Sequence, residues 1–392
     1  MTKEELQEQI LASTAKDYIF QLATGVGKTK LCLDKIANLY PDTTPKILIV
    51  VPYKNLIGDA KSNKGWYAEF VKWGYKKYLQ NVTFSCYASL QKHVGQWDCV
   101  VLDEAHHTSE RCQDLLKAFK IEHLFVLSAT LSREHKWFFN NQYPNIMEFN
   151  VNIHNAIDEG ILPEPRIILL PLTLDNKKIM KVVYKNPKKP FLRPVTIDFK
   201  ERFLYSRYTG KVIMRCTAAQ YSSYLDGLID WASRNGRKMI AAQQGGNRLK
   251  FLAAQKLNTI KQILKHLDKY RTLTFCGSIA NAISLGYPRI DSKIGLKYLD
   301  EFNAQKIDHL SCVEALDEGA NLTNCRIGIF QMINTSSRMA IQRSGRIYRH
   351  KEPILIFPYF VNSKEEQTVS EIISGYKEHL IETVNNINDI RI

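Results

Sequence analysis

The chain of 392 residues lacks several features that mark specialised classes of protein. It contains no run of 18 apolar residues, so no membrane-spanning helix and no membrane partner are expected. Its start, MTKEELQEQ, is charged, unlike the apolar stretch of a secretory signal. The eight cysteines form no CxxC pair and no regular spacing. Reduced, mostly buried thiols in a cytoplasmic protein, bacterial or in a phage-infected host, are therefore expected.

Acidic residues are in short supply relative to basic ones. The sequence has 54 Lys and Arg against 39 Asp and Glu, for a net charge of +15. Between Asn176 and Arg215, 12 basic residues stand against only two acids, Asp198 and Glu201. Such a concentration favours a polyanionic partner, although a positive charge also serves solubility.

The pattern of apolar runs predicts an α/β protein of more than one domain. We expect domain 1 at residues 1–155, a connector and basic insert at 156–244, and domain 2 at 245–392 with a C-terminal helix. Asn247 is expected to cap a long amphipathic helix that reaches Leu267, and Ser363 with Glu366 predicts the start of the last helix. The strands expected in the first domain are Tyr18–Leu22, Ile47–Val51, Val82–Cys86, Cys99–Asp103, Leu124–Thr130 and Ile146–Val151. Those expected later are Arg166–Leu172, Thr272–Cys276, Ser311–Leu316, Arg326–Gln331 and Pro353–Phe357.

The stretch Gln21–Thr29, QLATGVGKT, is the most informative in the chain. A short apolar run precedes it and a helical pattern follows, so the backbone N–H groups of a glycine loop and a helix N-terminus can face a phosphate. Lys28 is placed to reach the β- and γ-phosphates, and Thr29 to hold Mg²⁺. The strict pattern GxxxxGK[ST] fails because Leu22 stands at its first glycine. A chance glycine turn is the alternative.

The stretch Val100–His107, VVLDEAHH, places two acids after an apolar strand. The carboxyl end of a parallel strand is the usual ligand edge of the sheet. Asp103 is positioned to hold Mg²⁺, and Glu104 to orient or deprotonate the attacking water. The alternatives are a solvated turn and a zinc site formed by His106, His107 and Cys112, for which no fourth ligand has suitable spacing.

Together, ATGVGKT and DEAH resemble superfamily 2 helicases of the DEAD/DEAH kind, and most closely the branch of restriction-enzyme motor subunits and phage recombination helicases. In that branch ATGxGKT commonly replaces the strict loop. Further segments match the family in order: IVVPYKNL at Ile49–Leu56, LSATL at Leu127–Leu131, TFCGSI at Thr274–Ile279, ALDEGANL at Ala315–Leu322 and QRSGRIYR at Gln342–Arg349.

The resemblance implies two tandem RecA-like domains with parallel sheets, joined by the basic insert and closing on one ATP with Mg²⁺. Arg346 and Arg349 correspond to the family's arginine fingers, and Gln342 would meet the γ-phosphate; taken alone, this segment also fits a solvated basic helix. The implied catalytic residues are Lys28, Asp103, Glu104, Gln342, Arg346 and Arg349. The implied nucleotide contacts are Thr24, Gly25, Val26, Gly27, Lys28, Thr29 and Gly319, with Thr29 and Asp103 on Mg²⁺. Ser128 and Thr130 are implied to relay the nucleotide state.

Nucleic-acid contacts are expected from two sources. Six residues fall in the family's backbone-contacting motifs, namely Pro52, Lys54, Tyr87, Ser89, Gly277 and Ser278. The basic insert adds Lys188, Lys189 and Arg193, unless it is a β-rich insert with a solvated face. The aromatic segment from Trp66 to Tyr75 fits a helix that packs its rings inward better than a base-stacking platform.

These observations predict an ATP-dependent helicase or translocase that separates strands or remodels branches, most consistent with DNA and acting as a monomer. Adenine recognition has only Gln7 and Gln9 as candidates. The alternatives are a duplex translocase or ATPase switch within a larger complex, an RNA helicase, and a binding module with an inactive ATPase.

Overall fold

The computed structural model describes residues 2–59, 65–184, 194–198, 204–205, 212–295, 297–313, 322–333 and 343–392. Internal contacts divide the chain into two compact units. The first contains Met1–Pro165, Leu316–Asn324 and Ile341–Pro353. The second contains Arg166–Ala315, Cys325–Ala340 and Ile354–Ile392. Each unit has its own parallel sheet with helices, which confirms the expected α/β class.

The sheet of the first unit has six strands in the order β3-β2-β4-β5-β1-β6, and all its neighbouring strands are parallel. A sheet covered on both faces needs apolar side chains on both sides, and ILIVV in β2 is buried at every position. The strands are β1 (Tyr18–Leu22), β2 (Ile47–Val51), β3 (Val82–Cys86), β4 (Gln96–Leu102), β5 (Lys120–Ser128) and β6 (Met147–Val151).

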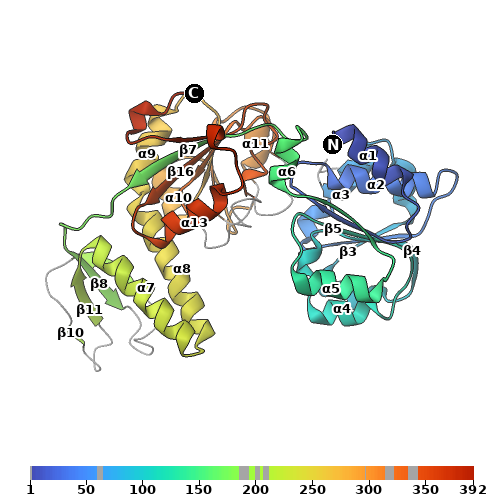
Figure 1. Cartoon of the computed structure of the whole chain (residues 1–392), viewed down its shortest axis with the longest axis horizontal. Helices are drawn as coiled ribbons and strands as arrows, with labels where there is room; N and C mark the ends of the chain where they lie inside the picture. The colour runs from blue at the N-terminus through green and yellow to red at the C-terminus, as the bar shows by residue number, and fades with distance from the viewer. Residues whose placement is uncertain are drawn as a thin grey trace. The chain divides into compact units, whose positions relative to one another are not determined.

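Helices cover both faces of this sheet (Figure 1). On one face lie α1 (Lys3–Ala12), α2 (Lys28–Leu39) and α3 (Gly65–Lys72), and on the other α4 (Glu110–Leu116) and α5 (Arg133–Gln142). Trp66 and Phe70 of α3 are 3% and 0% exposed, as the inward-packing interpretation of this segment predicts. The remaining helical segments are α6 (Ile153–Asp158), η1 (Lys54–Leu56), η2 (Lys76–Asn81), η3 (Tyr87–His93) and η4 (Ala105–His107).

The sheet of the second unit has seven strands in the order β13-β14-β12-β15-β16-β7-β17, again with parallel neighbours. Its strands are β7 (Arg166–Leu172), β12 (Thr272–Phe275), β13 (Arg289–Ile290), β14 (His309–Cys312), β15 (Ile327–Phe330), β16 (Ile354–Phe360) and β17 (Ile381–Thr383). The helical segments that accompany it are α10 (Ile279–Leu285), α11 (Leu299–Asn303), α13 (Lys364–Ile373), η5 (Glu378–Leu380) and η6 (Ile387–Asp389). As expected, Ser363 caps α13, although Glu366 accepts from the N–H of Asn362 instead of from that of the cap.

The long helix expected to start at Asn247 is organised differently. The structure has α8 (Lys238–Gln255) followed by α9 (Leu257–His266), and Asn247 lies inside α8. Lys256 separates the two helices and is fully buried, with its Nζ 3.1 Å from the carbonyl of Pro358 and 2.8 Å from Oε1 of Glu365. The helix also begins nine residues before the predicted cap, because the apolar residues of its first turn, such as Met239, are exposed and give no amphipathic signal.

The chain before α8 forms a small antiparallel sheet and a helix. The sheet has the order β10-β11-β8-β9, and β8 pairs with both β9 and β11. A shared core, which includes Leu174, Tyr221, Phe251 and Phe360, joins α7 and α8 to the end of β16. The expected boundary at residues 244/245 therefore falls within a helix. The elements are β8 (Met180–Tyr184), β9 (Pro194–Asp198), β10 (Leu204–Tyr205), β11 (Val212–Cys216) and α7 (Ala218–Arg234).

The first proposed boundary, at residues 155/156, lies ten residues before the division between the two units at Pro165 and Arg166. Residues 156–165, which include the second half of α6, therefore belong to the first unit. Within the described residues, no helix combines the length and apolar character needed to cross a bilayer.

Candidate nucleotide and nucleic-acid site

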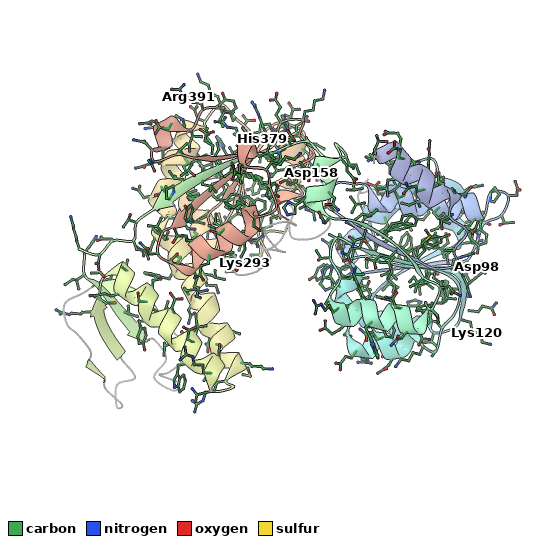
Figure 2. The ribbon with its side chains drawn as sticks, in the orientation of Figure 1. Asp98, Lys120, Asp158, Lys293, His379 and Arg391 are labelled. Carbon is green, nitrogen blue, oxygen red and sulfur yellow. The ribbon has the colours of Figure 1, made fainter. Side chains whose placement is uncertain are left out.

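Three adjacent strands of the first sheet bring the sequence-predicted residues to one edge. In the order β4-β5-β1, the three strands end at Leu102, Ser128 and Leu22. Asp103 and Glu104 follow the first of these strands, and the glycine loop of residues 22–29 follows the last. Asp98 and Lys120, labelled in Figure 2, mark the opposite, amino-terminal edge of β4 and β5.

At two positions of the glycine loop, the backbone has a conformation that only glycine adopts readily. Gly25 and Gly27 have φ values of +100° and +105°, and Gly27 is the N-cap of α2. A Cβ on Gly25 would also lie 3.2 Å from Cδ2 of Leu162. The Nζ of Lys28 donates to the carbonyl of Leu22 over 3.1 Å, which holds the ammonium group beside the loop. The result is a cradle of backbone N–H groups with a cation at its rim.

Asp103 is fixed by contacts from three directions. Its Oδ2 accepts a 2.8 Å hydrogen bond from the indole of Trp66, and its Oδ1 accepts a 3.0 Å bond from the N–H of Glu104. The buried hydroxyl of Tyr87 donates to the Asp103 carbonyl over 2.8 Å. Burial, followed by the charge of Glu104, raises the pKa of Asp103 to about 6, while the Trp66 hydrogen bond and Lys28 act in the opposite direction.

Glu104 occupies a strained backbone conformation next to a chain of polar contacts. Its φ is +46°, a value uncommon for a residue with a Cβ. Its Oε2 lies 3.5 Å from Nδ1 of His106, and the same ring nitrogen lies 3.2 Å from Oγ of Ser128. Ser128, which is fully buried, donates to the carbonyl of Thr130 over 2.7 Å. The carboxylate is thereby linked to the segment that follows β5.

The arginine-bearing segment packs in the first unit. Residues 343–353 group with this unit although β15 and β16, which flank the segment in sequence, belong to the second sheet. The carbonyl of Gly345 lies 3.8 Å from the position of a Cβ on Gly25. Arg346 is 7% exposed. Desolvation and then the charge of Arg346 lower the pKa of Arg349 to about 10, while Glu69 on α3 acts in the opposite direction.

Two family models match the chain. The model described as "Type III restriction enzyme, res subunit" matches residues 2–133, and the model described as "Helicase conserved C-terminal domain" matches residues 237–351. A search of curated protein sequences gives no match.

Solved structures share the fold along nearly the whole chain. A single-residue variant of S. cerevisiae Dbp5 bound to RNA and ADP BeF3 aligns with a TM-score of 0.58 at 11% identity, covering 97% of this chain and 89% of that chain. The same protein without the substitution gives 0.57 with the same identity and coverage. The helicase domain of Pyrococcus furiosus Hef gives 0.49 at 14% identity, covering 94% of this chain and 97% of that chain.

The two family models thus cover residues 2–133 and 237–351, and the two parallel sheets have the fold of the Dbp5 structures. The chain belongs to the superfamily 2 helicases. The expected pair of RecA-like domains is confirmed, and this helicase is an enzyme of the nucleic-acid-stimulated ATPase class.

The residues predicted to contact nucleic acid have different environments in the helicase. Pro52 and Ser89 are half-buried and Lys54 is exposed, beside the carboxyl ends of β2 and β3. The ring of Tyr87 is in the hydrophobic core and its hydroxyl donates to the carbonyl of Asp103. Its side chain therefore supports the carboxylate edge, and its contact with nucleic acid stays a prediction.

The matching residues of the second domain lie after β12. Gly277 is buried, and a Cβ on it would meet Cβ of Ala253 at 2.5 Å. Its N–H lies 3.4 Å from Oε1 of Gln331, whose Nε2 donates to the carbonyl of Ala253 over 3.0 Å. Ser278 caps α10. Gly319, Gln342, Lys188, Lys189 and Arg193 lie outside the described residues.

The sequence did not predict two supporting roles, those of Trp66 and Tyr87, whose side chains both donate hydrogen bonds to Asp103. Gln7, a candidate for adenine recognition, instead donates its Nε2 to Oδ2 of Asp34 over 2.8 Å. Among the residues that the structure describes, no three His, Cys, Asp or Glu side chains gather as metal ligands, so the zinc interpretation gains no support.

Proposed function

We propose that this helicase couples Mg²⁺-dependent ATP hydrolysis to movement along DNA and separates strands or remodels branched structures. The observation that carries the proposal is the packing of the glycine loop, the carboxylate pair and the arginine segment within one unit. These are the three parts that phosphoryl transfer requires: a phosphate cradle, a carboxylate group for metal and water, and cations for the developing charge.

The glycine loop is assigned to the phosphates. Backbone N–H groups of residues 24–29 bind the phosphate oxygens, and the positive φ of Gly25 and Gly27 allows the close approach. The Lys28 ammonium, now bonded to the carbonyl of Leu22, pairs with the β- and γ-phosphates.

The chemistry of the donor set fits Mg²⁺. Thr29 supplies a hydroxyl and Asp103 a carboxylate, both hard oxygen ligands of the kind that Mg²⁺ prefers. The cost of burying Asp103 as an anion, visible in its raised pKa, is reduced by a nearby cation. When bound, the metal neutralises charge on the phosphates.

Glu104 is assigned to the attacking water. Its Oε2 is buried, and the contact described for it is the 3.5 Å approach of His106. A carboxylate with spare acceptor capacity can take a hydrogen bond from water and align it for attack. The 3.2 Å contact between His106 and Ser128 gives a physical route from this carboxylate to the following segment, consistent with the relay expected for Ser128 and Thr130.

The arginine segment is assigned to charge stabilisation. Arg346 is buried and Arg349 has a lowered pKa, because desolvation and mutual repulsion disfavour two cations held close together. An anionic phosphoryl group relieves that repulsion. Gln342 is proposed to meet the γ-phosphate, and Gly319 to allow close backbone approach to the nucleotide.

DNA is proposed as the substrate because the family model over residues 2–133 is that of a restriction-enzyme subunit. The Dbp5 structures are RNA complexes, so RNA is the direct competitor. The test measures ATPase rates with single-stranded DNA, duplex DNA, forked DNA and RNA of equal length. We expect DNA to stimulate most strongly, and forked DNA to be unwound.

Lys28→Ala is expected to abolish stimulated ATPase, whereas Lys30→Ala, a lysine on the same helix bonded to Asp34, is the matched control and should retain it. Stimulation by RNA alone would contradict the assignment to DNA. Stimulation by duplex without unwinding of forks would favour the second candidate, a duplex translocase, which the restriction-enzyme model also supports.

A further inference from the structure

The turn between α7 and α8 presents apolar and basic side chains to solvent. Trp231 is 46% exposed, and Met239, at 87%, is the most exposed large apolar side chain in the described residues. Arg234, Arg237 and Lys238 are also exposed, with Asp230 as the acid beside them. The guanidinium of Arg237 lies over the Trp231 ring, 4.8 Å from its centroid. We call the segment from Trp231 to Met239 the hairpin turn.

The hairpin turn is held in place by its own hydrogen bonds. Gly236 adopts φ +67°, the N–H of Arg237 donates to the carbonyl of Ala232 over 2.8 Å, and Nδ2 of Asn235 donates to the carbonyl of Trp231 over 2.8 Å. This pattern closes the C-terminus of α7 in the manner of a helix cap. Trp231 is therefore exposed on an ordered, hydrogen-bonded segment.

The two helices below the turn are firmly joined. Arg248, which is 5% exposed, pairs with Asp226 at 2.5 Å, and the rings of Tyr221 and Phe251 meet edge to face with centroids 4.9 Å apart. Figure 1 shows the turn at the end of this hairpin that is farther from the seven-stranded sheet. A rigid pair of helices thus carries an exposed tryptophan at its tip.

We propose that the hairpin turn binds single-stranded polynucleotide, with a base stacked on Trp231 and phosphates held by Arg234, Arg237 and Lys238. The argument is charge complementarity combined with an exposed ring: three cations against one acid suit a polyanion, and every base has a face that stacks on an indole. Arg237 adds a second planar group, since its guanidinium both stacks and binds phosphate. This inference rests on the proposed function, because it assumes a polynucleotide substrate.

The test measures binding of fluorescent oligo(dT) and of duplex DNA to the full chain without nucleotide. We expect Trp231→Ala to weaken oligo(dT) binding by about 5- to 150-fold, the range for loss of one stacked base. Trp231→Phe should recover part of the affinity, and duplex binding should change less than binding of the single strand. Trp137→Ala, which removes a tryptophan 69% exposed on α5, is the matched control and should leave affinity unchanged.

A second measurement addresses the cations. Replacing Arg234, Arg237 and Lys238 together by Gln should reduce the salt dependence of oligo(dT) binding by roughly two in the slope of log K against log salt, at about 0.7 for each phosphate contact. Thermal unfolding midpoints equal to the wild type establish that the variants are folded.

Unchanged oligo(dT) affinity in both folded variants would overturn this inference and leave the proposed function intact. Equal weakening of single-strand and duplex binding would also overturn it, because stacking needs an unpaired base. If the wild type bound neither DNA nor RNA and showed no stimulated ATPase, the proposed function itself would fail.

Discussion

The indole nitrogen of Trp66 donates a 2.8 Å hydrogen bond to the carboxylate of Asp103, a residue 37 positions later in the chain. The other carboxylate oxygen accepts from the N–H of Glu104. Both oxygens are therefore oriented before any ligand binds, and α3 acts as the support of the candidate metal site. A supporting hydrogen bond of this kind orients a ligand and tunes its affinity for the metal.

Trp66→Phe removes this hydrogen bond and keeps an aromatic ring in the core. The carboxylate then rotates more freely, so we expect the Mg²⁺ concentration that gives half-maximal ATPase to rise about tenfold. Trp97→Phe is the control, because Trp97 is also buried and donates to a carbonyl, that of His93, over 2.9 Å. An equal shift in both variants would mean that the effect is general loosening of the core.

Asp103→Asn is expected to make the stability of the protein, without nucleotide or Mg²⁺, less dependent on pH. The folded state raises the pKa of Asp103 to about 6, so ionisation lowers stability as the pH rises from its ordinary value near 4 through 6. The amide carries no charge but has only one acceptor oxygen for the two N–H donors of Trp66 and Glu104, and this loss is the same at every pH. The stability of the variant relative to the wild type should therefore rise by roughly 1–3 kcal/mol between pH 5 and pH 8, since one pKa unit equals about 1.4 kcal/mol. Thermal unfolding at both pH values measures this rise; a difference independent of pH would contradict the electrostatic cause.

Ser128→Ala removes the hydroxyl that His106 meets at 3.2 Å. Glu104 and the glycine loop are unchanged, so the ATPase rate should fall by no more than about threefold. Unwinding of forked DNA should fall by about tenfold, which corresponds to a loss of about 1.4 kcal/mol of coupling between the nucleotide and nucleic-acid sites. The ratio of strands separated to ATP hydrolysed is the measurement. Ser85→Ala, at a buried serine in β3, is the control. Parallel losses of both activities would argue against a relay.

Gly277→Ala places a Cβ 2.5 Å from that of Ala253. Backbone or helix must shift, at a cost of about 1–3 kcal/mol for overpacking of this kind. Adding Ala253→Gly removes the clashing carbon and should restore most of the thermal stability, less about 1 kcal/mol for a glycine inside a helix. Gly286→Ala is a comparison of another kind: nothing lies within 4 Å of its Cβ, and its φ of +83° alone makes the substitution unfavourable. Failure of Ala253→Gly to rescue would place the strain elsewhere.

Local patterns were enough to predict the sheets and the edge that carries the site. Ile47–Val51 is apolar at every position, as a strand covered on both faces must be, and its predicted bounds agree with those of β2. Glycines in QLATGVGKT predicted a backbone that other residues disfavour, and Gly25 and Gly27 have positive φ values. These signals are short in range, so the sequence displays them directly.

Features that depend on distant partners were not predictable in this way. Lys256 lies between α8 and α9 and is buried against Pro358 and Glu365, about a hundred residues away, whereas a lysine in an amphipathic pattern is normally assigned to solvent. Tyr87 lies in a segment that suggested a surface, and its contact with Asp103 arises only when β3 and β4 both pair with β2. The hydrogen bond from Trp66 to Asp103 likewise joins residues 37 positions apart, which only the folded chain brings together.

Helix α8 runs without a break from Lys238 to Gln255, a length of about 27 Å at 1.5 Å per residue. One end follows the hairpin turn, and the other places Ala253 against Gly277 and Gln331, at the strand ends of the second sheet. This single helix therefore joins the exposed hairpin turn to the core of the second unit. The same helix would therefore connect a polynucleotide bound at the hairpin turn to the strand ends beside Ser278.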